Sequence, residues 1–130
     1  MNSSFKESLV RAEKAMLQAL AHDREFLNRY WPEHRPRILR MLEAVADTLT
    51  GSRRKPARIL DLGCSNGFLC VLGQELGAEV TGADAYMDVQ RETLFRNRGI
   101  MEHRINLNGK PRSSAPLRPG RLALEFLGGE

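Results

Sequence analysis

The sequence has few cysteines and no long apolar run. Its two cysteines, Cys64 and Cys70, cannot build a disulfide framework, and a reducing compartment suits them. No stretch approaches the roughly 20 apolar residues that a membrane-spanning helix needs. The first residues, MNSSFKE, also lack the apolar run of a secretory signal. We therefore expect a cytoplasmic protein with no membrane segment.

The composition is that of an ordinary globular protein. Of the 130 residues, 42% are hydrophobic and 28% are charged, which argues against wholesale disorder and fibrous architectures. The net charge of +4 is mild, but residues 104–121 hold five basic residues and no acidic one. This segment could contact nucleic acid. A solvated loop is the favoured interpretation, because no aromatic side chain is interleaved there to stack on bases.

Residues 1–51 are predicted to form a helical segment. Pro32 and Pro36 are expected to interrupt it, because a proline pushes the preceding residue out of helical geometry. Gly51 lies where a helix end favours a left-handed residue. The apolar residues of the two predicted helices recur every three or four positions, and they are Phe5, Leu9, Ala12, Met16 and Leu20 in the first and Ile38, Leu42, Val45 and Leu49 in the second.

The pattern changes to alternating strands and helices over residues 57–130. Gly77 and Gly99 are expected to end two helices, and the proline-rich stretch 108–120 is expected to form a loop. Alternation of this kind is typical of an α/β fold with an open parallel sheet. The predicted strands are 59–62, 79–84, 100–107 and 122–127, and the predicted helices are 68–76 and 88–98.

The residues that carry chemistry lie between positions 57 and 84. A strand runs into Asp61-x-Gly63-x-x-x-Gly67, where glycines allow a sharp turn and the close approach of a ligand. Asp84 ends the next strand, and a carboxylate there can accept hydrogen bonds from a ribose diol. Open α/β sheets bind ligands at the carboxyl ends of such strands. We therefore expect a nucleoside site at this edge.

Two kinds of nucleoside ligand compete for this site. The dinucleotide pattern G-x-G-x-x-G requires a glycine where this chain has Cys64 and Ser65, so a nicotinamide cofactor fits poorly. S-adenosylmethionine has no pyrophosphate and carries an amine and a sulfonium. It favours a carboxylate beside the turn, and Asp61 supplies one.

The segments ILDLGCSNG (59–67) and GAEVTGADA (77–85) resemble the class I S-adenosylmethionine-dependent methyltransferases. The resemblance covers about residues 57–109 and is closest to small-molecule-type methyltransferase domains. It implies that Gly63 and Gly67 shape the loop under the cofactor and that Asp61 holds the methionine end. It also implies that Asp84 binds the ribose hydroxyls and that Ala85 lies along the adenosine.

The resemblance extends to two further positions of the cofactor site. The end of the third strand usually offers a polar residue near the adenine amino group, and Asn108 is the candidate here. Cys64 belongs to the cofactor loop, but its side chain is predicted to pack as a small residue and not to act as a nucleophile. Cys70 is predicted to be a core residue.

Each of these residues also has a structural interpretation. Gly63 and Gly67 could be plain turn glycines, and Asp61 could only orient the loop. Asp84 could be the N-cap of the helix that follows it. The histidines share no metal spacing, so no metal site is predicted, and they are His22, His34 and His103.

The resemblance implies a seven-stranded sheet of order 3-2-1-4-5-7-6, of which this chain would supply only strands 3-2-1-4. The predicted fold is therefore a set of N-terminal helices followed by a partial Rossmann-like parallel sheet. The last strand, 122–127, would be an exposed edge, so self-association or marginal stability is expected. The N-terminal helices could cover the cofactor, with Phe5, Tyr30 and Trp31 as candidates for that lid. Trp31, beside Tyr30 and Pro32, is also predicted to be a packing anchor and not part of a ligand cage.

The predicted function is that of the cofactor-binding half of a methyltransferase, with the methyl acceptor left open. The acceptor-binding half would follow position 130. A non-catalytic module that binds the adenosyl cofactor or a partner chain is the alternative. Nucleic-acid binding through residues 104–121 is a third and weaker hypothesis.

Overall fold

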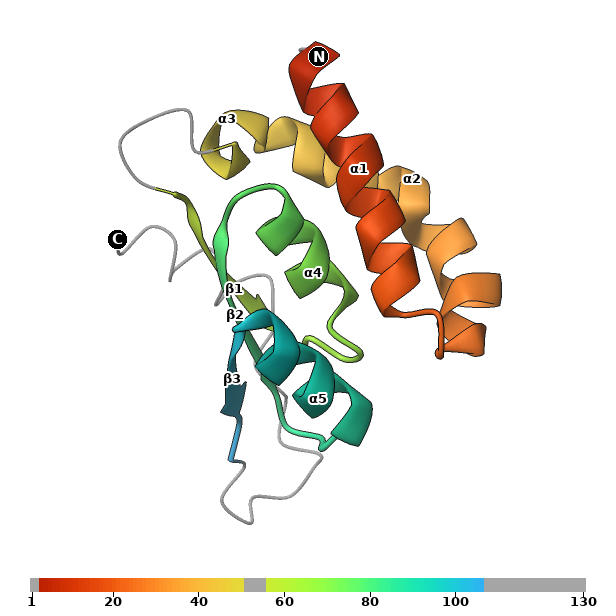
Figure 1. Ribbon diagram of the computed structural model, residues 1–130, viewed down its shortest axis with the longest axis vertical. Coiled ribbons are helices and arrows are strands. Elements are labelled where there is room, and N and C mark those ends of the chain that lie inside the picture. The colour runs from red at the N-terminus through yellow and green to blue at the C-terminus, as the bar shows by residue number, and fades with distance from the viewer. Residues whose placement is uncertain (1–2, 51–55, 107–130) are drawn as a thin grey trace. The chain divides into compact units, whose positions relative to one another are not determined.

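The computed structural model describes residues 3–50 and 56–106 of the chain (Figure 1). Five predictions lie wholly or mostly outside this range: the helix end at Gly51, the loop 108–120, the strand at 122–127, Asn108, and the basic segment 104–121. Self-association through the 122–127 edge therefore stays a prediction. Among the described residues, no helix is long and apolar enough to cross a membrane.

The chain divides into two compact units. The first contains the described residues up to Ala57 together with Val71–Glu79, and the second contains Arg58–Cys70 and the described residues from Val80 onward. Helix α4 (Phe68–Glu75) contributes to both units.

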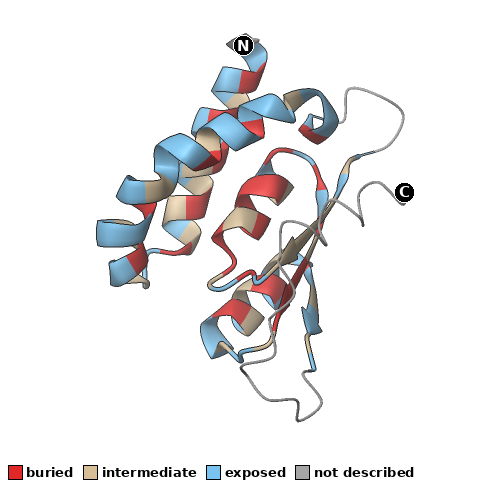
Figure 2. Cartoon of the chain, turned by 180° about the vertical axis from the view of Figure 1, so that it is seen from behind, coloured by how far each residue is buried: buried red, intermediate tan, exposed pale blue. Residues whose placement is uncertain are grey.

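The first unit is built mainly from the predicted N-terminal helices. Helix α1 spans Ser3–Ala19, and its predicted apolar face is buried throughout, with Met16 and the following Leu20 both 0% exposed. Figure 2 shows buried and exposed positions alternating along this helix. The remaining helices of the segment are η1 (Phe26–Tyr30), α2 (Trp31–Ala44) and α3 (Ala46–Leu49). The prediction of a helical N-terminal segment is therefore confirmed for the described residues.

Pro32 and Pro36 do not interrupt the helix, and that prediction is wrong. Helix α2 contains both prolines, and Trp31, just before Pro32, is helical at φ −63° and ψ −49°. The π-helical turn η1 leads directly into α2, and the Trp31 N–H donates to the Phe26 carbonyl five residues back. This wider turn leaves room for the ring of Pro32, which occupies the first turn of α2, where a missing N–H costs little.

The second predicted helix is broken at Val45, which was expected on its buried face. Val45 has φ −112° and ψ 19°, so α2 ends there and the short α3 begins after it. Its side chain is 43% exposed, whereas Ile38, Leu42 and Leu49 are buried as predicted. The break rotates α3 relative to the repeat of α2, so a single helical period does not describe both.

Two of the three lid candidates are core residues. Phe5 is 3% exposed and Trp31 is 4% exposed, and only Tyr30 is at the surface. The Trp31 indole N–H donates to Glu13 Oε2 at 2.9 Å, and Arg35 donates to both oxygens of Glu13 at 2.6 and 3.0 Å. Phe5 and Trp31 therefore stabilise the helical unit and are not available as a movable cover.

The second unit contains most of a three-stranded parallel sheet of order β1-β2-β3. Strand β1 is Arg58–Leu62, β2 is Glu79–Asp84 and β3 is Met101–Arg104. Strands β2 and β3 pair in register from Thr81 with Met101 to Asp84 with Arg104. The α/β class and a partial Rossmann-like sheet are thus present. The observed order agrees with the 3-2-1 part of the predicted sheet.

Glycines end both helices of the alternating region, as predicted. Gly77 has φ 97° after α4, and Gly99 has φ 67° after α5 (Val89–Arg98). In each case the glycine N–H bonds three residues back and the next N–H bonds five residues back, which satisfies carbonyls at the helix end.

Helix α5 packs through residues that the apolar pattern did not single out. Val89 is 69% exposed, whereas Arg91 and Phe95 are 4% and 1% exposed. The Phe95 ring closes against two glycines of the same unit. A Cβ atom on Gly67 would lie 2.5 Å from the ring, and one on Gly82 would lie 2.6 Å from it. These glycines therefore permit close packing of α5.

We expect Gly82→Ala to destabilise the protein by about 1–3 kcal/mol, because its Cβ would overlap the buried Phe95 ring. Urea unfolding would measure the change. Gly82→Ala combined with Phe95→Leu should cost less than the sum of the two single changes, since the smaller side chain removes the overlap. Strict additivity would contradict this packing constraint.

We also expect Glu13→Gln to destabilise the helical unit at neutral pH. The hydrogen bond from Arg35 lowers the pKa of Glu13, burial opposes this, and the Trp31 indole N–H adds to the lowering. The stabilisation is therefore present above the ordinary value of 4.5 and is lost as the pH falls through the lowered pKa.

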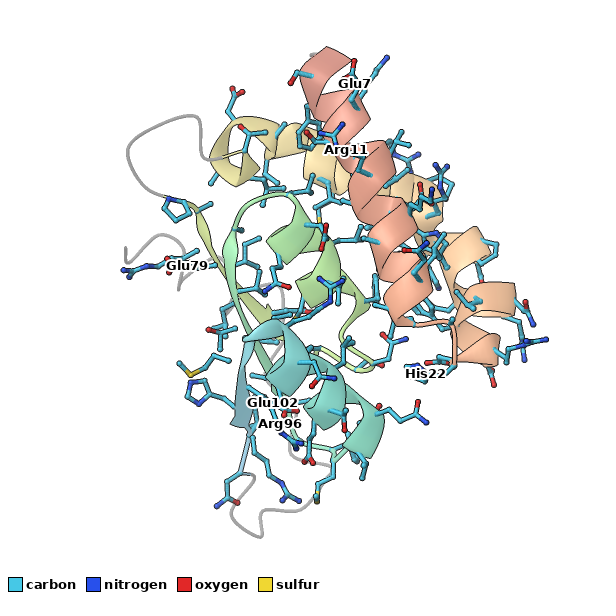
Figure 3. All side chains as sticks on the ribbon, in the orientation of Figure 1. Glu7, Arg11, His22, Glu79, Arg96 and Glu102 are labelled. Atoms are coloured by element: carbon cyan, nitrogen blue, oxygen red, sulfur yellow. The ribbon has the colours of Figure 1, made fainter. Side chains whose placement is uncertain are left out.

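The cost at pH 7 should be about 1 kcal/mol, because Arg35 is partly exposed and water screens the pair. Thermal unfolding at pH 7 and pH 3 would measure it. Glu7→Gln, an exposed position on the same helix (Figure 3), is the matched control and should change little. A cost that stays constant down to pH 3 would contradict the assignment.

Candidate functional site at the carboxyl ends of β1 and β2

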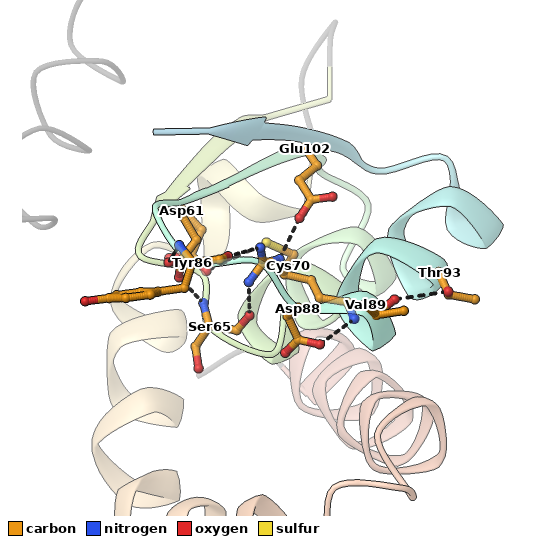
Figure 4. Close-up of polar contacts among 10 residues, drawn as sticks. Asp61, Ser65, Cys70, Tyr86, Asp88, Val89, Thr93 and Glu102 are labelled. Atoms are coloured by element: carbon orange, nitrogen blue, oxygen red, sulfur yellow. Dashed lines mark hydrogen bonds and ion pairs between the residues drawn. The ribbon is translucent and has the colours of Figure 1, made fainter. Parts of the chain in front are cut away.

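The structure brings most of the predicted cofactor residues together in the second unit. The loop 63–67 follows β1 and is bonded to the end of β2, because the Gly63 and Cys64 N–H groups donate to the Ala83 carbonyl at 2.7 and 3.0 Å. Asp61 precedes this loop, and Asp84 and Ala85 lie at the end of β2. The two predicted carboxylates therefore share one edge of the sheet (Figure 4).

Asp84 holds the loop through both of its oxygens. Its Oδ2 accepts a hydrogen bond from the Ser65 N–H at 2.8 Å, and its Oδ1 accepts one from the Tyr86 N–H at 2.9 Å. The residue is 9% exposed. Asp84 thus has a structural role, which is to hold the backbone of the two loops, whether or not it also binds a ligand.

The alternative interpretation of Asp84 as a helix cap is wrong. Asp88 is the N-cap of α5, and its side chain accepts from the Arg91 N–H at 3.0 Å. Four residues separate the end of the strand from the first residue of the helix, so Asp84 lies too far from its first turn to cap it.

Ser65 has a backbone conformation that favours glycine. Its φ is 53°, and it is the one non-glycine with positive φ among the described residues. Gly63 and Gly67 on either side also have positive φ, at 74° and 90°. A serine in this region is strained unless its surroundings hold it there. The sharp turn predicted for the loop is therefore present, but one of its left-handed positions has a side chain.

Arg91 is the site residue that sequence reasoning missed. Its guanidinium is nearly buried and makes three polar contacts, with Nε donating to Glu102 Oε2 at 2.6 Å, Nη1 to the Ser65 carbonyl at 2.7 Å and Nη2 to the Tyr86 carbonyl at 2.6 Å. Figure 4 shows these contacts converging between the loop and α5. Burial acts to lower the pKa of Arg91, but the bond to Glu102 and the nearby negative charge outweigh burial and raise it.

A weak signal for Arg91 existed in the sequence. Arg91 lies four positions before Phe95, on the same face of a helix that has few apolar residues. A charged residue on a face that must be buried requires partners, and the carbonyls of two tight loops supply them.

Asp61 is a carboxylate with an unusual environment. Burial, opposed by a weak contact from the Cys70 thiol and reinforced by the negative charge of Asp84, raises the pKa of Asp61 to about 6. The thiol contact, from Cys70 Sγ to Oδ2, is 3.7 Å long. Among the described residues no cationic side chain forms an ion pair with Asp61. A cationic group that reached this carboxylate would stabilise its charged form.

The two cysteines are core residues, as predicted. Cys64 is 1% exposed and Cys70 is 0% exposed, and both thiols are free. A hydrogen bond with Cys64, together with burial, raises the pKa of the Cys70 thiol. Neither sulfur is poised for nucleophilic attack. Cys64 contributes to the loop 63–67 through its backbone, while its sulfur lies toward Gly82.

Exposed apolar side chains follow the end of β2. Tyr86 is 62% exposed, Met87 is 58% exposed and Val89 is 69% exposed, while Ala85 is half-buried. Figure 4 shows the Tyr86 ring extending outward from the loop. Within residues 3–50 and 56–106, no group of acidic, histidine or cysteine side chains could hold a metal ion. The site therefore offers carboxylates and apolar surface, which suit an organic cation with hydroxyl groups.

We expect Asp61→Asn to stabilise the protein at pH 7.5. Because burial raises the pKa of Asp61 above its ordinary value of 3.8, the folded state keeps a proton that the unfolded chain loses between about pH 4 and pH 6. Stability therefore falls as the pH rises through that window, and the loss persists above it. Asparagine does not ionise, so it avoids this loss in the free energy of unfolding, which amounts to about 1–3 kcal/mol.

Thermal unfolding between pH 3.5 and pH 8 would measure the effect. The gain should vanish at the acidic end, where the native carboxyl is neutral as well. Asp47→Asn, at an exposed position of α3, is the control and should show no such pH dependence. A wild-type protein as stable as Asp61→Asn at pH 7.5 would contradict the account.

No protein-family model, curated protein or solved structure matches this chain. The methyltransferase resemblance of residues 59–67 and 77–85 therefore stays a prediction. The case for a function depends on the chemistry of Asp61, Asp84 and the loop between them.

Proposed function

We propose that this chain binds S-adenosylmethionine and supplies the cofactor-binding part of a methyltransferase. The observation that carries the proposal is the placement of Asp61, a half-buried carboxylate without a cationic partner among the described residues, beside a left-handed loop and Asp84. The resemblance to class I methyltransferases predicts the same residues for the same ligand.

Asp61 would bind the amino group of the methionine part of the ligand. A positive group near this carboxylate favours its charged form and offsets the cost of burial. Binding would therefore lower the pKa of Asp61 from about 6 and release a proton at mildly acidic pH. The sulfonium adds a second positive charge close to the two carboxylates.

Asp84 would bind the ribose hydroxyls with its remaining acceptor capacity. Each oxygen already accepts one backbone N–H, and an ionised carboxylate offers about four lone-pair sites in all. Since Asp84 is 9% exposed, a ribose would have to reach it beside the exposed Tyr86. Ala85 and the exposed apolar side chains after β2 would then lie along the adenosine. Asn108, the proposed adenine contact, is outside the described residues.

Methyl transfer from a sulfonium is an in-line displacement that needs positioning and exclusion of water more than covalent assistance. The residues described here would bind and orient the methyl donor. The residues that hold a methyl acceptor are not identified among them, so the acceptor is left open.

Calorimetric titration with S-adenosylhomocysteine tests the proposal. We expect micromolar binding by the wild-type protein and at least about tenfold weaker binding by Asp61→Asn, because a charge-assisted hydrogen bond is lost. A ligand analogue without the amino group should bind both proteins equally weakly, which localises the contact. Asp47→Asn is the matched control and should bind as the wild type does.

A folded wild-type protein that does not bind S-adenosylhomocysteine would contradict the proposal and leave a protein-interaction module as the alternative. Tighter binding of a nicotinamide dinucleotide in a parallel titration would also contradict it. Equal affinity of wild type and Asp61→Asn would show that the amino group is held elsewhere.

A further inference from the structure

Ser65 and Tyr86 are each held from both sides by the same two side chains. The N–H groups of both residues donate to Asp84, at 2.8 and 2.9 Å. Their carbonyl groups both accept from Arg91, at 2.7 and 2.6 Å. The loop after β1 and the loop after β2 are therefore joined by a closed set of four hydrogen bonds, which we call the Asp84–Arg91 clamp.

The clamp holds the peptide groups on both sides of Ser65, whose left-handed backbone conformation is strained. The Ser65 N–H and carbonyl lie in the two peptide groups that flank its φ and ψ rotations. Relaxing φ from 53° to a negative value would turn these peptides relative to each other and break the bond to Asp84 or the bond to Arg91. The left-handed conformation is thus maintained by contacts outside the loop.

Arg91 is suited to this role by the shape of its guanidinium. Its planar fork reaches the two carbonyls while Nε binds Glu102 on β3. A lysine would keep the charge, but its single ammonium lacks the fixed fork that spans both loops. The neighbouring charged groups are Glu102 on β3 and Asp84 on β2, so the clamp combines charge with shape.

We propose that Arg91 is a positioning residue for the adenosyl ligand. By holding the Ser65 and Tyr86 carbonyls it keeps both N–H donors on Asp84 and so fixes the carboxylate that would bind the ribose. This inference rests on the proposed function, because it concerns the orientation of the same site.

The test uses Arg91→Lys with and without Ser65→Gly. We expect Arg91→Lys to weaken S-adenosylhomocysteine binding by about tenfold or more, as for other residues that orient a ligand contact. Ser65→Gly in the Arg91→Lys background should restore most of that affinity, because glycine adopts positive φ without being held there. Glu102→Gln is the matched control. It removes the negative charge, but its amide oxygen can still accept from Arg91 Nε and both carbonyl bonds are left, so it should change affinity by less than about threefold.

A spectroscopic readout separates positioning from general stability. In the wild-type protein the Ser65 and Tyr86 amide protons should resonate downfield, since both donate to a carboxylate. Arg91→Lys should shift both resonances, whereas Glu102→Gln should leave them in place even if it lowers the melting temperature.

Each other outcome is decisive. Arg91→Lys that binds as tightly as wild type overturns the proposal. So does a double variant that stays weak or unfolded, because Arg91 then acts on the fold and not through Ser65. If the wild type binds no S-adenosylhomocysteine, the proposed function fails and the ligand role of Arg91 fails with it, while the amide shifts still report whether the clamp exists. If the wild type binds S-adenosylhomocysteine and Arg91→Lys binds it with the same affinity, the inference about Arg91 fails while the proposed function stands.

Discussion

A guanidinium group that is almost fully buried has to satisfy its N–H groups inside the protein, and Arg91 does so with two loop carbonyls and one carboxylate. Those partners lie after β1, after β2 and on β3, so one side chain ties the carboxyl ends of the sheet together. Two of them, the Ser65 and Tyr86 carbonyls, belong to the residues whose N–H groups bind Asp84. Burying a charge in this way is favourable only when every partner is in place.

Gly67 is required for packing as well as for the turn that the sequence indicates. Gly67 was expected to admit a ligand, but the space that its Cβ would fill is occupied by the Phe95 ring. Gly82 in β2 meets the same ring. Close packing of α5 on the sheet therefore constrains these two positions. Gly63, which is exposed and left-handed, remains the glycine that a ligand could approach.

Asp61 illustrates how a residue proposed to bind a ligand can oppose stability. Burial raises the pKa of Asp61, so the charged form that a cationic ligand would need is disfavoured in the free protein. A structural role alone would be served as well by a neutral side chain. A carboxylate with a perturbed pKa is typical of functional sites, where stability is often lower than it could be.

Local patterns were enough to predict the α/β class, the ends of α4 and α5 at Gly77 and Gly99, and the meeting of Asp61 with Asp84 at one sheet edge. These features follow from local patterns: the periods of helices and strands, glycines in the left-handed conformation, and the order of strands and helices along the chain. The sequence by itself therefore determines them. The passage of α2 through Pro36, the pairing of Trp31 with Glu13 and the clamp of Arg91 on Ser65 were decided only by tertiary structure. Each depends on a partner distant in sequence or on a neighbouring turn, and no local period encodes which carbonyl or carboxylate will be within reach of a buried side chain.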